Sequence, residues 1–494
     1  MRPVIYHSEQ LQAWEHRWFS AGNSSYGLMQ QAAWQMTQHI IAQLGMVIAR
    51  EPVIGLWCGA GNNGGDGWLI AAYLKQAGFC VWVHEAVTPQ SSDARSAQAF
   101  ALSTGLKVYP QLEELPRADV HIDALFGIGL NRPLSGQYTN IIAQFNQQSG
   151  YKIAVDIPSG LQADTGRVFG TACRVDLSLT VLGYKAGLFT GQGAAYAGQV
   201  IYIELLPPDS FLKPLAYLDI HSPCLPRRSK TSHKGSNGHV LVIGGNENMG
   251  GAAILSAEAA LAVGAGKVTL LTHSRHHGAV LSRCPNIMLL GFPAVEQFKP
   301  EWADHISQGM DCVAMGMGLG RDEWAKAIWQ AFLPLLEQKN HIQKVVLDAD
   351  ALWHLADEQH IEPELHSHCY CTPHPGEAAR LLGTNTVAVE QDRIAAIYAL
   401  QRKYGGNWLL KGAGSLSLDQ HSLTICGLGN PGMATAGMGD ILAGMAAGLL
   451  AQLPDMALHE VVALHAAAGD LLAQAGERGI QATDMLGVLR QVVN

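Results

Sequence analysis

The chain has 494 residues, of which 48% are hydrophobic and 15% are charged, and its formal net charge is −9 at pH 7. Because this length exceeds what one ordinary hydrophobic core organises, we expect two large domains. The apolar content excludes a disordered chain. The negative charge, together with the lack of a long basic run, excludes a general nucleic-acid binder.

The cysteines and the apolar runs indicate the cellular compartment of the protein. Nine cysteines lie scattered without a CxxC pair, and the nearest two, Cys369 and Cys371, lack the companion ligands of a zinc site, so we interpret the cysteines as reduced thiols. Charged residues such as Glu15 and Arg17 interrupt any signal-peptide core. The longest nearly apolar stretch, 441–453, is shorter than the roughly 18 residues of a membrane span. We therefore expect a cytoplasmic protein with a buried helix there.

The N-terminal half alternates short β-rich apolar runs with helical stretches. The runs end at glycine, proline or acidic residues, which is typical of ligand loops beyond the carboxyl ends of strands in an open α/β sheet. The pattern predicts a parallel sheet whose motifs meet at one edge. The predicted strands lie at 53–57, 80–84, 120–124, 152–156 and 177–182.

The strongest local motif follows the first of these strands, where residues 59–67 read GAGNNGGDG and contain five glycines. Backbone amides in such a turn, together with a helix N-terminus, form a nest for phosphate, and glycine lets a ligand come close. The alternative is a tight strand-to-helix turn without a ligand. Since the motif is neither GxGxxG nor a Walker motif with its lysine, an ordinary dinucleotide fold and a P-loop ATPase are disfavoured.

Two further strands end in acidic residues, at Asp123 in HIDALFGIGLNRPLSG and at Asp156 in KIAVDIPSGL. Asp123 with Asn63 and Ser159 offers several oxygen atoms, which favours a hard, monovalent cation over zinc. Asp156 is a candidate for handling protons, because burial among ligand loops raises a carboxyl pKa. Its alternative role is an N-cap or a fastening contact for the loop.

In this order and spacing, GNNGGDG, DALFGIGLNRPLSG and VDIPSGL resemble the NAD(P)H-hydrate epimerase domain over nearly the whole N-terminal half, predicted as 1–215. The resemblance implies a Rossmann-like three-layer sandwich, a catalytic Asp156, and K⁺ bound by Asn63, Asp123 and Ser159. It also implies substrate contacts from three places in the chain: Asn62, Asn63, Gly64, Gly65 and Asp66; Gly127, Ile128, Gly129, Leu130, Asn131, Arg132 and Pro133; and Asp156.

A proline-rich segment without clear periodicity separates the two halves, and we place the linker at 216–231. A second α/β alternation begins at His239 and predicts a separate domain at 232–494. Its predicted strand segments lie at 239–245, 267–272, 311–320, 344–352 and 407–415.

Glycine motifs recur in the second half, near residues 244 and 315, at 411–415 and from 430. In the last of them, Asp440 follows glycines at a predicted helix start. Its carboxylate there lies near the positive helix end and anion-binding amides, which suits it to deprotonate a hydroxyl beside a phosphate. Glycine loops, one base and a magnesium ion suffice for phosphoryl transfer. The alternative is that Asp440 caps the helix.

The segment ATAGMGD resembles the ribokinase-like superfamily, and TPHPGEAARLL at 372–382 resembles its magnesium-associated TPNxxE motif with His374 at the asparagine position. His374 alone could instead be a core histidine bonded to backbone. Together with SHKGSNGHVLVIGG, KGAGS and GNPGMATAGMGD, these segments resemble the ADP-dependent NAD(P)H-hydrate dehydratase domain from about residue 232 to the end. The resemblance implies a ribokinase-like α/β fold.

The second resemblance also implies chemistry. The hydroxyl of the hydrated nicotinamide ring is phosphorylated by the β-phosphate of ADP, and loss of phosphate then restores the double bond, with AMP as the other product. Asp440 is the implied base and Mg²⁺ the implied cofactor. The implied contacts to hydrated NAD(P)H are Ala253, Gly318, His374 and Asp440, and those to the adenine nucleotide are Lys411, Gly412, Ala413, Gly414, Ser415 and Gly439.

We therefore expect a bifunctional repair enzyme that acts on hydrated NADH and NADPH with ADP as co-substrate, forms a homo-oligomer, and has no nucleic-acid or membrane partner. One alternative is an ATP-dependent ribokinase-like kinase of a small molecule with a regulatory N-terminal half. Another is a nucleotide-sensing protein without chemistry, since pocket motifs report binding rather than turnover. The sensor hypothesis leaves Asp440 and Asp156 unexplained.

Overall fold

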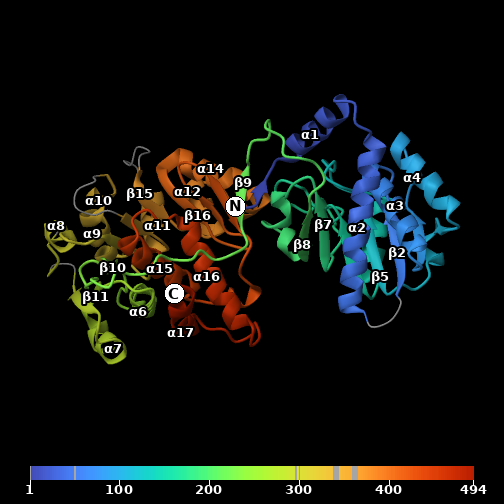
Figure 1. Cartoon of the computed structure of the whole chain (residues 1–494). Coiled ribbons are helices and arrows are strands. Elements are labelled where there is room, and N and C mark those ends of the chain that lie inside the picture. Colours follow the sequence, from blue (N-terminus) through green and yellow to red (C-terminus); the bar gives the residue numbers. More distant parts are fainter. Residues whose placement is uncertain (1, 49–51, 295–296, 300, 338–343, 359–364) are drawn as a thin grey trace. The chain divides into compact units, whose positions relative to one another are not determined.

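A computed structural model describes residues 2–48, 52–294, 297–299, 301–337, 344–358 and 365–494 (Figure 1). The chain divides into two compact units, Met1–Tyr217 and Leu218–Asn494. Within the predicted linker, β9 (Ala216–Asp219) forms a strand whose first residues pair with β1 (Val4–Ile5), and residues 220–238 form no helix or strand. The exact linker bounds stay a prediction.

The first unit is built on a seven-stranded sheet in which every neighbouring pair is parallel, in the order β4-β3-β2-β5-β6-β7-β8. All five predicted strands are confirmed. The order reverses between β2 and β5, so ligands are expected beyond the carboxyl ends of these two strands. The strands are β2 (Val53–Cys58), β3 (Cys80–Glu85), β4 (Lys107–Tyr109), β5 (Val120–Ala124), β6 (Tyr151–Val155), β7 (Leu177–Val181) and β8 (Gln199–Ile203).

Side-chain alternation along β2 gives this sheet two apolar faces. Ile54, Leu56 and Cys58 pack in one core with residues of α2, α3 and α4. Trp57 points to the other face, where its ring lies 5.5 Å from that of Phe145 in α5. The three-layer sandwich is thus confirmed. Its helices are α1 (Ser8–Ser20), α2 (Ser25–Val47), α3 (Asn62–Gln76), α4 (Ser92–Ser103) and α5 (Gln137–Gln147).

The sheet of the second unit runs in the order β18-β17-β16-β15-β14-β13-β10-β11-β12, parallel from β16 to β12 and antiparallel at β17 and β18. The predicted strands are again confirmed, and the order reverses between β10 and β13. The strands are β10 (His239–Ile243), β11 (Lys267–His273), β12 (Met288–Phe292), β13 (Cys312–Met315), β14 (Lys344–Leu347), β15 (Leu365–Cys371), β16 (Gly405–Leu410), β17 (Leu416–Leu418) and β18 (Leu423–Cys426).

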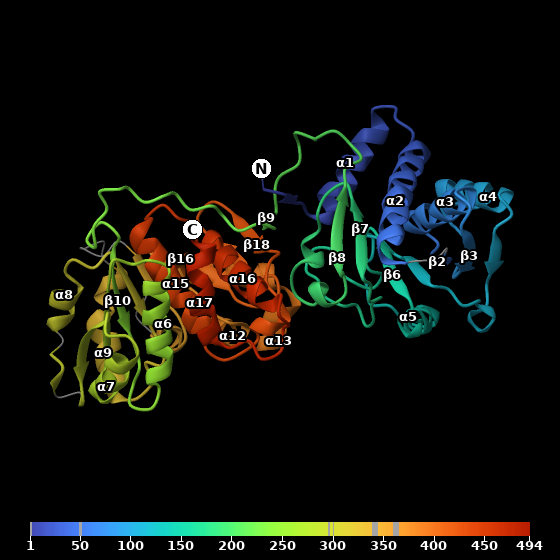
Figure 2. The same cartoon turned by 60° about the horizontal axis from the view of Figure 1, so that its bottom comes forward.

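Helices cover both faces of this sheet, with α6, α16 and α17 on one side and α9, α12 and α14 on the other (Figures 1 and 2). The predicted buried helix is α15, which packs closely on α6. A side chain at Gly444 would lie 2.0 Å from the carbonyl oxygen of Ser256, so only glycine allows the two helices to approach this closely. The helices are α6 (Gly250–Ala262), α7 (His277–Arg283), α8 (Trp302–Ser307), α9 (Glu323–Phe332), α10 (Pro334–Glu337), α11 (Asp350–Asp357), α12 (Pro375–Leu382), α13 (Thr386–Gln391), α14 (Arg393–Tyr404), α15 (Met438–Gln452), α16 (Leu458–Ala473) and α17 (Ala482–Val492).

All nine cysteines are free thiols. Within the described ranges, no helix is both long and apolar enough to span a bilayer.

The strand-to-helix turn after β2 gives a first testable prediction. Gly64→Ala would place a methyl group 2.0 Å from the carbonyl oxygen of Gly59, which is backbone and cannot move aside. Overpacking costs about 1–3 kcal/mol, which exceeds the roughly 1 kcal/mol that alanine gains over glycine inside a helix. Calorimetry of the full chain should therefore show the unfolding transition of the first unit at lower temperature.

Gly61→Ala is the matched control, because a methyl group there meets nothing within 4 Å and φ is −92°. Its transition should stay close to that of the natural chain. Equal destabilisation by both variants would contradict the packing account of this turn.

Candidate active sites

The glycine motif of the first unit lies at the start of α3, with Gly61 as the N-cap. The first bond of the helix runs from Gly65 N to Gly61 O at 3.1 Å, so the amides of Asn62, Asn63 and Gly64 precede it. Amides in this position are free to bind an anion, aided by the positive end of the helix dipole. The backbone at the start of α3 therefore has the amide arrangement that the predicted phosphate nest requires.

Close backbone packing is a second reason why glycine occupies several positions of this motif. Side chains at Gly59, Gly64 and Gly67 would lie 2.0, 2.0 and 2.5 Å from atoms of Leu125, Gly59 and Ala124. These residues are thus glycine because β2, the turn and β5 approach one another. A ligand is therefore not needed to explain the glycines at these three positions. At Gly61 a side chain would meet nothing within 4 Å, so the prediction that this glycine lets a ligand approach stays open.

Two of the three predicted cation ligands, Asp123 and Ser159, come together at the carboxyl edge of the sheet. Asp123 is fully buried and accepts hydrogen bonds from the amide of Ser159 at 2.7 Å and from its hydroxyl at 2.6 Å. Asn63 Oδ1 lies 3.3 Å from where a side chain of Gly127 would be, and the buried Asn63 Nδ2 has no hydrogen-bond partner among the described residues. Burial raises the pKa of Asp123, although the bonds from Ser159 oppose this. A buried carboxylate among neutral oxygens is an environment that a cation would stabilise.

Residues 127–133 form the loop between β5 and α5, at the same edge of the sheet. Gly127, Ile128 and Leu130 are half-buried, whereas Gly129, Asn131, Arg132 and Pro133 are exposed. The loop meets the glycine motif where Gly127 contacts Asn63. The structure thus brings two of the three predicted substrate-binding segments together.

Asp156 follows β6 in a left-handed conformation, with φ of 68°. Its carboxylate is bound at 2.5 Å by the ammonium group of Lys185, whose side chain is 1% exposed. Lys185 also donates to Thr180 Oγ1 at 2.9 Å and to the carbonyl oxygen of Val181 at 2.6 Å. Asp156 caps no helix, but its long contact to the amide of Val181, at 3.3 Å, does fasten a loop. Strained backbone of this kind is typical of functional sites.

The negative charge of Asp156 raises the pKa of two neighbouring carboxyl groups. Burial raises the pKa of Glu15, on α1, to about 7, and the negative charge of Asp156 adds to the effect. Burial also raises the pKa of Asp66, on α3, well above its usual range, again with help from Asp156 and Glu15. Glu15 therefore titrates close to neutral pH and can exchange a proton with a ligand. The sequence analysis missed Lys185 and used Glu15 only to exclude a signal peptide.

In the second unit, the central contact is an ion pair between strand ends. Lys411, which follows β16, donates to Asp348, which follows β14, at 2.6 Å, and lies 4.0 Å from Glu377 of α12. A side chain at Gly439 would be 3.4 Å from the Lys411 ammonium nitrogen, so the start of α15 lies beside the pair. Asp440 is the third residue of that helix, and its N-cap is Gly437, so the alternative that Asp440 caps the helix is wrong.

These neighbours set the protonation of the site. Burial and the charge of Asp348 raise the pKa of Asp440 to about 6, while Lys411 opposes the rise. Burial raises the pKa of Glu377 to about 7, against the effect of Lys411. Burial works against the charge of Lys411, but Asp348 and Glu377 outweigh it and raise the Lys411 pKa. Asp440 is thus ionised at neutral pH yet basic enough to accept a proton.

His374 is the N-cap of α12. Its Nδ1 accepts a hydrogen bond from the amide of Gly376 at 2.9 Å, and its own amide donates to Glu377 Oε2 at 2.8 Å. The imidazole is 57% exposed, so the alternative of a core histidine is wrong. Partial burial of the ring and the charge of Lys411 lower the His374 pKa, which keeps Nδ1 available as an acceptor.

The loop at 411–415 is held from below by Arg393, whose side chain is 1% exposed and donates to the carbonyl oxygens of Leu410 and Lys411 at 3.2 and 3.1 Å. Gly412 has φ of 140° and Gly414 has φ of 60°, which explains the two glycines. Ser415 closes the turn by donating to the carbonyl oxygen of Gly412 at 3.0 Å. The loop, with Ala413 at its exposed tip, lies where a nucleotide phosphate could meet Lys411.

Ala253 and Gly318 lie at the reversal of strand order. Gly318 has φ of 63°, and its carbonyl oxygen accepts a hydrogen bond from the amide of Asn246 at 2.7 Å. Ala253 is fully buried in α6, so the structure does not present its methyl group to a ligand.

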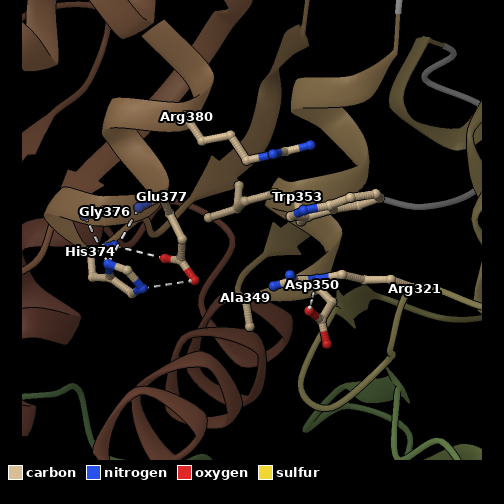
Figure 3. A pocket seen from close by; sticks show the side chains of 9 residues that line it. Arg321, Ala349, Asp350, Trp353, His374, Gly376, Glu377 and Arg380 are labelled. Carbon is tan, nitrogen blue, oxygen red and sulfur yellow. Dashed lines mark hydrogen bonds and ion pairs between the residues drawn. The ribbon is translucent and has the colours of Figure 1, made fainter. Parts of the chain in front are cut away.

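A pocket of about 550 Å³ opens beside His374 (Figure 3). It does not include Asp440 or Lys411, but it reaches Glu377, which lies 4.0 Å from Lys411, and Ala349, which directly follows Asp348. Among the described residues, no group of three or more His, Cys, Asp or Glu side chains is arranged to hold a metal ion. The pocket is lined by Arg321, Ala349, Asp350, Leu352, Trp353, His374, Gly376, Glu377 and Arg380.

Sequence reasoning missed Asp348, Glu377 and Arg393 as site residues. Asp348 had a signal, because it ends a predicted strand as Asp123 and Asp156 do. Glu377 stands in the quoted TPHPGE segment. Arg393 had none, since nothing near it in the sequence shows that it supports a loop 17 and 18 residues away.

Comparison with known proteins follows the division into two units. The family model described as NAD(P)H-hydrate dehydratase matches residues 240–490, and the one described as YjeF-related protein N-terminus matches residues 25–187. A solved ADP/ATP-dependent NAD(P)H-hydrate dehydratase from Bacillus subtilis, co-crystallised with ATP and Mg²⁺, is 25% identical, with a TM-score of 0.47 over 56% of this chain and 98% of that one.

Two curated relatives match along both units. The bifunctional NAD(P)H-hydrate repair enzyme Nnr of Coxiella burnetii is 38% identical, over 99% of this chain and 99% of that protein. The enzyme of the same name from Vibrio cholerae is 40% identical, over 87% of this chain and 86% of that protein. Both resemblances found in the sequence are thereby confirmed, and the chain belongs to the family of bifunctional NAD(P)H-hydrate repair enzymes.

Proposed function

We propose that the first unit interconverts the R and S epimers of hydrated NADH and NADPH, and that the second dehydrates the S epimer with ADP. One observation carries the second assignment: the carboxylate of Asp440 lies at a glycine-lined helix start beside the Lys411–Asp348 ion pair. That arrangement supplies a base and a cation at a helix end suited to phosphate. Neither a regulatory first half nor a sensor without chemistry accounts for the buried proton-holding clusters in both units.

The proposed dehydration has two steps. Asp440 takes the proton of the ring hydroxyl, whose oxygen forms a bond to the β-phosphorus of ADP as the bond to the bridging oxygen breaks and AMP leaves. The carbon–oxygen bond of the phosphorylated ring then breaks, phosphate departs with the bonding electrons, and the neighbouring ring carbon loses a proton to form the double bond. Lys411, with the amides around Gly439 and residues 412–415, neutralises charge on the transferred group.

The residues present fit a magnesium ion that is bound chiefly through phosphates. Asp348 and Glu377 are hard oxygen donors beside the proposed phosphate position, and magnesium ordinarily keeps waters and takes only one or two carboxylates. When bound, the ion would supply charge neutralisation on the phosphates. His374 and Gly318 are proposed to orient the hydrated ring, and Ala253 to contact it through its backbone.

In the first unit, we assign proton handling to Asp156, with Lys185 holding its carboxylate in place. Glu15, with a pKa of about 7, is placed to exchange protons beside it, and burial raises the pKa of Asp66 as well. The amides of Asn62–Gly65 and the loop at 127–133 are proposed to bind the substrate phosphates. The buried Asp123, with Asn63 and Ser159, fits K⁺, which when bound would balance the charge of that carboxylate and fix the loop. A cytoplasmic location, a homo-oligomer and the absence of nucleic-acid and membrane partners stay predictions.

Replacing the base tests the second unit. Asp440→Asn keeps the shape of the side chain but cannot accept a proton, so we expect NADH regeneration from the S epimer with ADP to fall by roughly 10²–10⁴-fold. The absorbance of reformed NADH measures the rate. Asp304→Asn, on the exposed side of α8, is the control and should keep full activity. Undiminished turnover in Asp440→Asn would remove Asp440 from the mechanism.

The pH dependence of dehydration follows from the same cluster. Because Asp440 must be ionised and its pKa is about 6, kcat/KM should rise through pH 6 and level off near 7. Lys411 lowers the Asp440 pKa, so Lys411→Met should move the rising limb to higher pH, in addition to slowing the reaction. A limb that stays in place or moves to lower pH in this variant would disprove the proposed coupling.

The first unit is tested with a mixture of both epimers. In Asp156→Asn, we expect NADH to recover quickly only to the S fraction, followed by a slow spontaneous phase, because dehydration continues while epimerisation is lost. Lys185→Met should give the same two phases, since it leaves the Asp156 carboxylate buried without its cation. Single-phase recovery in both variants would show that neither residue is needed.

A further inference from the structure

Two arginine side chains flank Trp353 in the pocket of the second unit. The guanidinium carbon of Arg321 lies 5.1 Å from the centre of the indole ring, and that of Arg380 lies 4.5 Å from it. Figure 3 shows the indole between the two guanidinium groups. Both arginines and Trp353 line the cavity of about 550 Å³. Stacking on an aromatic ring restricts the guanidinium planes and favours the positive charge.

Asp350 binds the guanidinium group of Arg321 through Nε only. Arg321 Nε donates to Asp350 Oδ1 at 3.1 Å, while the other oxygen of Asp350 accepts from the amide of Gly320 at 2.9 Å. Asp350 thus ties the loop after β13 to the start of α11 and fixes the base of the side chain. In the part of the chain that the structure describes, the two terminal nitrogens of Arg321 form no hydrogen bond, so they remain available to a ligand.

Arg380 is held more weakly. Its described ion pair joins Nη2 to Asp357 at 3.5 Å, and the Asp357 side chain is 66% exposed. An exposed pair at this distance contributes about 0–1 kcal/mol, so a doubly charged ligand can compete with it. The two arginines therefore present donors to the pocket that the protein's own carboxylates leave largely unused.

The pocket continues from the proposed reaction centre. Asp348, which pairs with Lys411, is followed directly by Ala349 and Asp350 in its wall. Ala349 has φ of 48°, a strained conformation that turns the chain between the two aspartates. As a result, Asp348 binds Lys411 at the proposed reaction centre and Asp350 binds Arg321. Glu377 borders both regions. A substrate with its reacting ring at Asp440 can thus extend into the pocket.

We propose that Arg321 and Arg380, stacked on Trp353, bind a phosphate group of the hydrated dinucleotide away from its reacting ring. This inference rests on the proposed function of the second unit. Guanidinium groups match phosphate oxygens with paired donors, and the volume is within the usual 300–1,000 Å³ of small-molecule sites. The phosphate has two sources, the pyrophosphate of both hydrated nucleotides or the ribose phosphate found only in hydrated NADPH.

The test compares Arg321→Met, Arg380→Met and the double variant, in which the apolar stem is kept and the charge removed. Each loses charge-assisted hydrogen bonds to bound substrate, so KM for the S epimer should rise roughly tenfold to a hundredfold per arginine, while kcat changes little. A KM increase with both hydrated NADH and hydrated NADPH identifies the pyrophosphate. An increase with hydrated NADPH alone identifies the ribose phosphate.

Arg283→Met is the matched control, because Arg283 is similarly exposed, at 46%, pairs with Glu258 and does not line the pocket. Its KM should equal that of the natural chain. Arg321→Lys keeps the charge without the planar fork and should lie between the natural chain and Arg321→Met. Unchanged KM for both hydrated nucleotides in the double variant, or a rise in KM for ADP alone, would overturn the proposal.

Calorimetric titration with intact NADPH and NADH separates this proposal from the proposed reaction. Affinity for NADPH should fall in the double arginine variant and persist in Arg283→Met, whether or not the chain turns over hydrated nucleotide. If the natural chain fails to regenerate NADH yet binds NADPH through the arginines, the reaction is wrong and the phosphate site stands. Equal NADPH affinity in the natural chain and the double variant would refute the phosphate site. Circular dichroism confirms that each variant is folded.

Discussion

Each unit of this protein depends on a lysine that pairs with the aspartate directly after a parallel strand; Lys185 is buried, and Lys411 is 19% exposed. Lys185 binds Asp156 at 2.5 Å after β6, and Lys411 binds Asp348 at 2.6 Å after β14. Removing one partner of a buried ion pair costs about 3–5 kcal/mol, because the other charge is left uncompensated. The pairs therefore fix the strand-end loops and at the same time set the electric field where the chemistry is proposed.

That field explains why neighbouring carboxyl groups hold protons. Around Asp156, burial and negative charge raise the pKa of Glu15 to about 7 and that of Asp66 well above its usual range. Around Asp348, they raise the pKa of Asp440 to about 6 and that of Glu377 to about 7. In both units a carboxyl group beside the ion pair has a pKa of about 7, Glu15 in the first and Glu377 in the second, which suits proton transfer in water at pH 7.

The sequence was sufficient for the architecture because the signals are local. Apolar runs ended by glycine or aspartate predicted five strands in each of the two sheets, and parallel topology forces their carboxyl ends to one edge, where Asp123 and Ser159 indeed meet. The strands β4, β8, β12, β15, β17 and β18 were not predicted. Of these, β4, β17 and β18 have at most four residues, too few for a clear apolar run.

The partners of the site could not be predicted, because the contacts that define them span the sequence. Lys185 lies 29 residues from Asp156, and Lys411 lies 63 residues from Asp348. Lys185 stands in no motif, and the KGAGS motif that marks Lys411 as a nucleotide contact does not indicate that it pairs with Asp348. The glycines of GAGNNGGDG illustrate a related limit: a ligand and a close backbone contact both demand glycine, and only the structure shows that Gly59, Gly64 and Gly67 serve the contact.

The most direct measurement follows all products at once when the full chain, ADP and magnesium act on an equal mixture of both hydrated NADH epimers. The account predicts complete recovery of NADH in a single fast phase, with one AMP and one phosphate formed for each NADH and no phosphorylated nucleotide left over. Recovery that stops at the S fraction would contradict the role of the first unit. Accumulation of a stable phosphorylated product would contradict the role of the second.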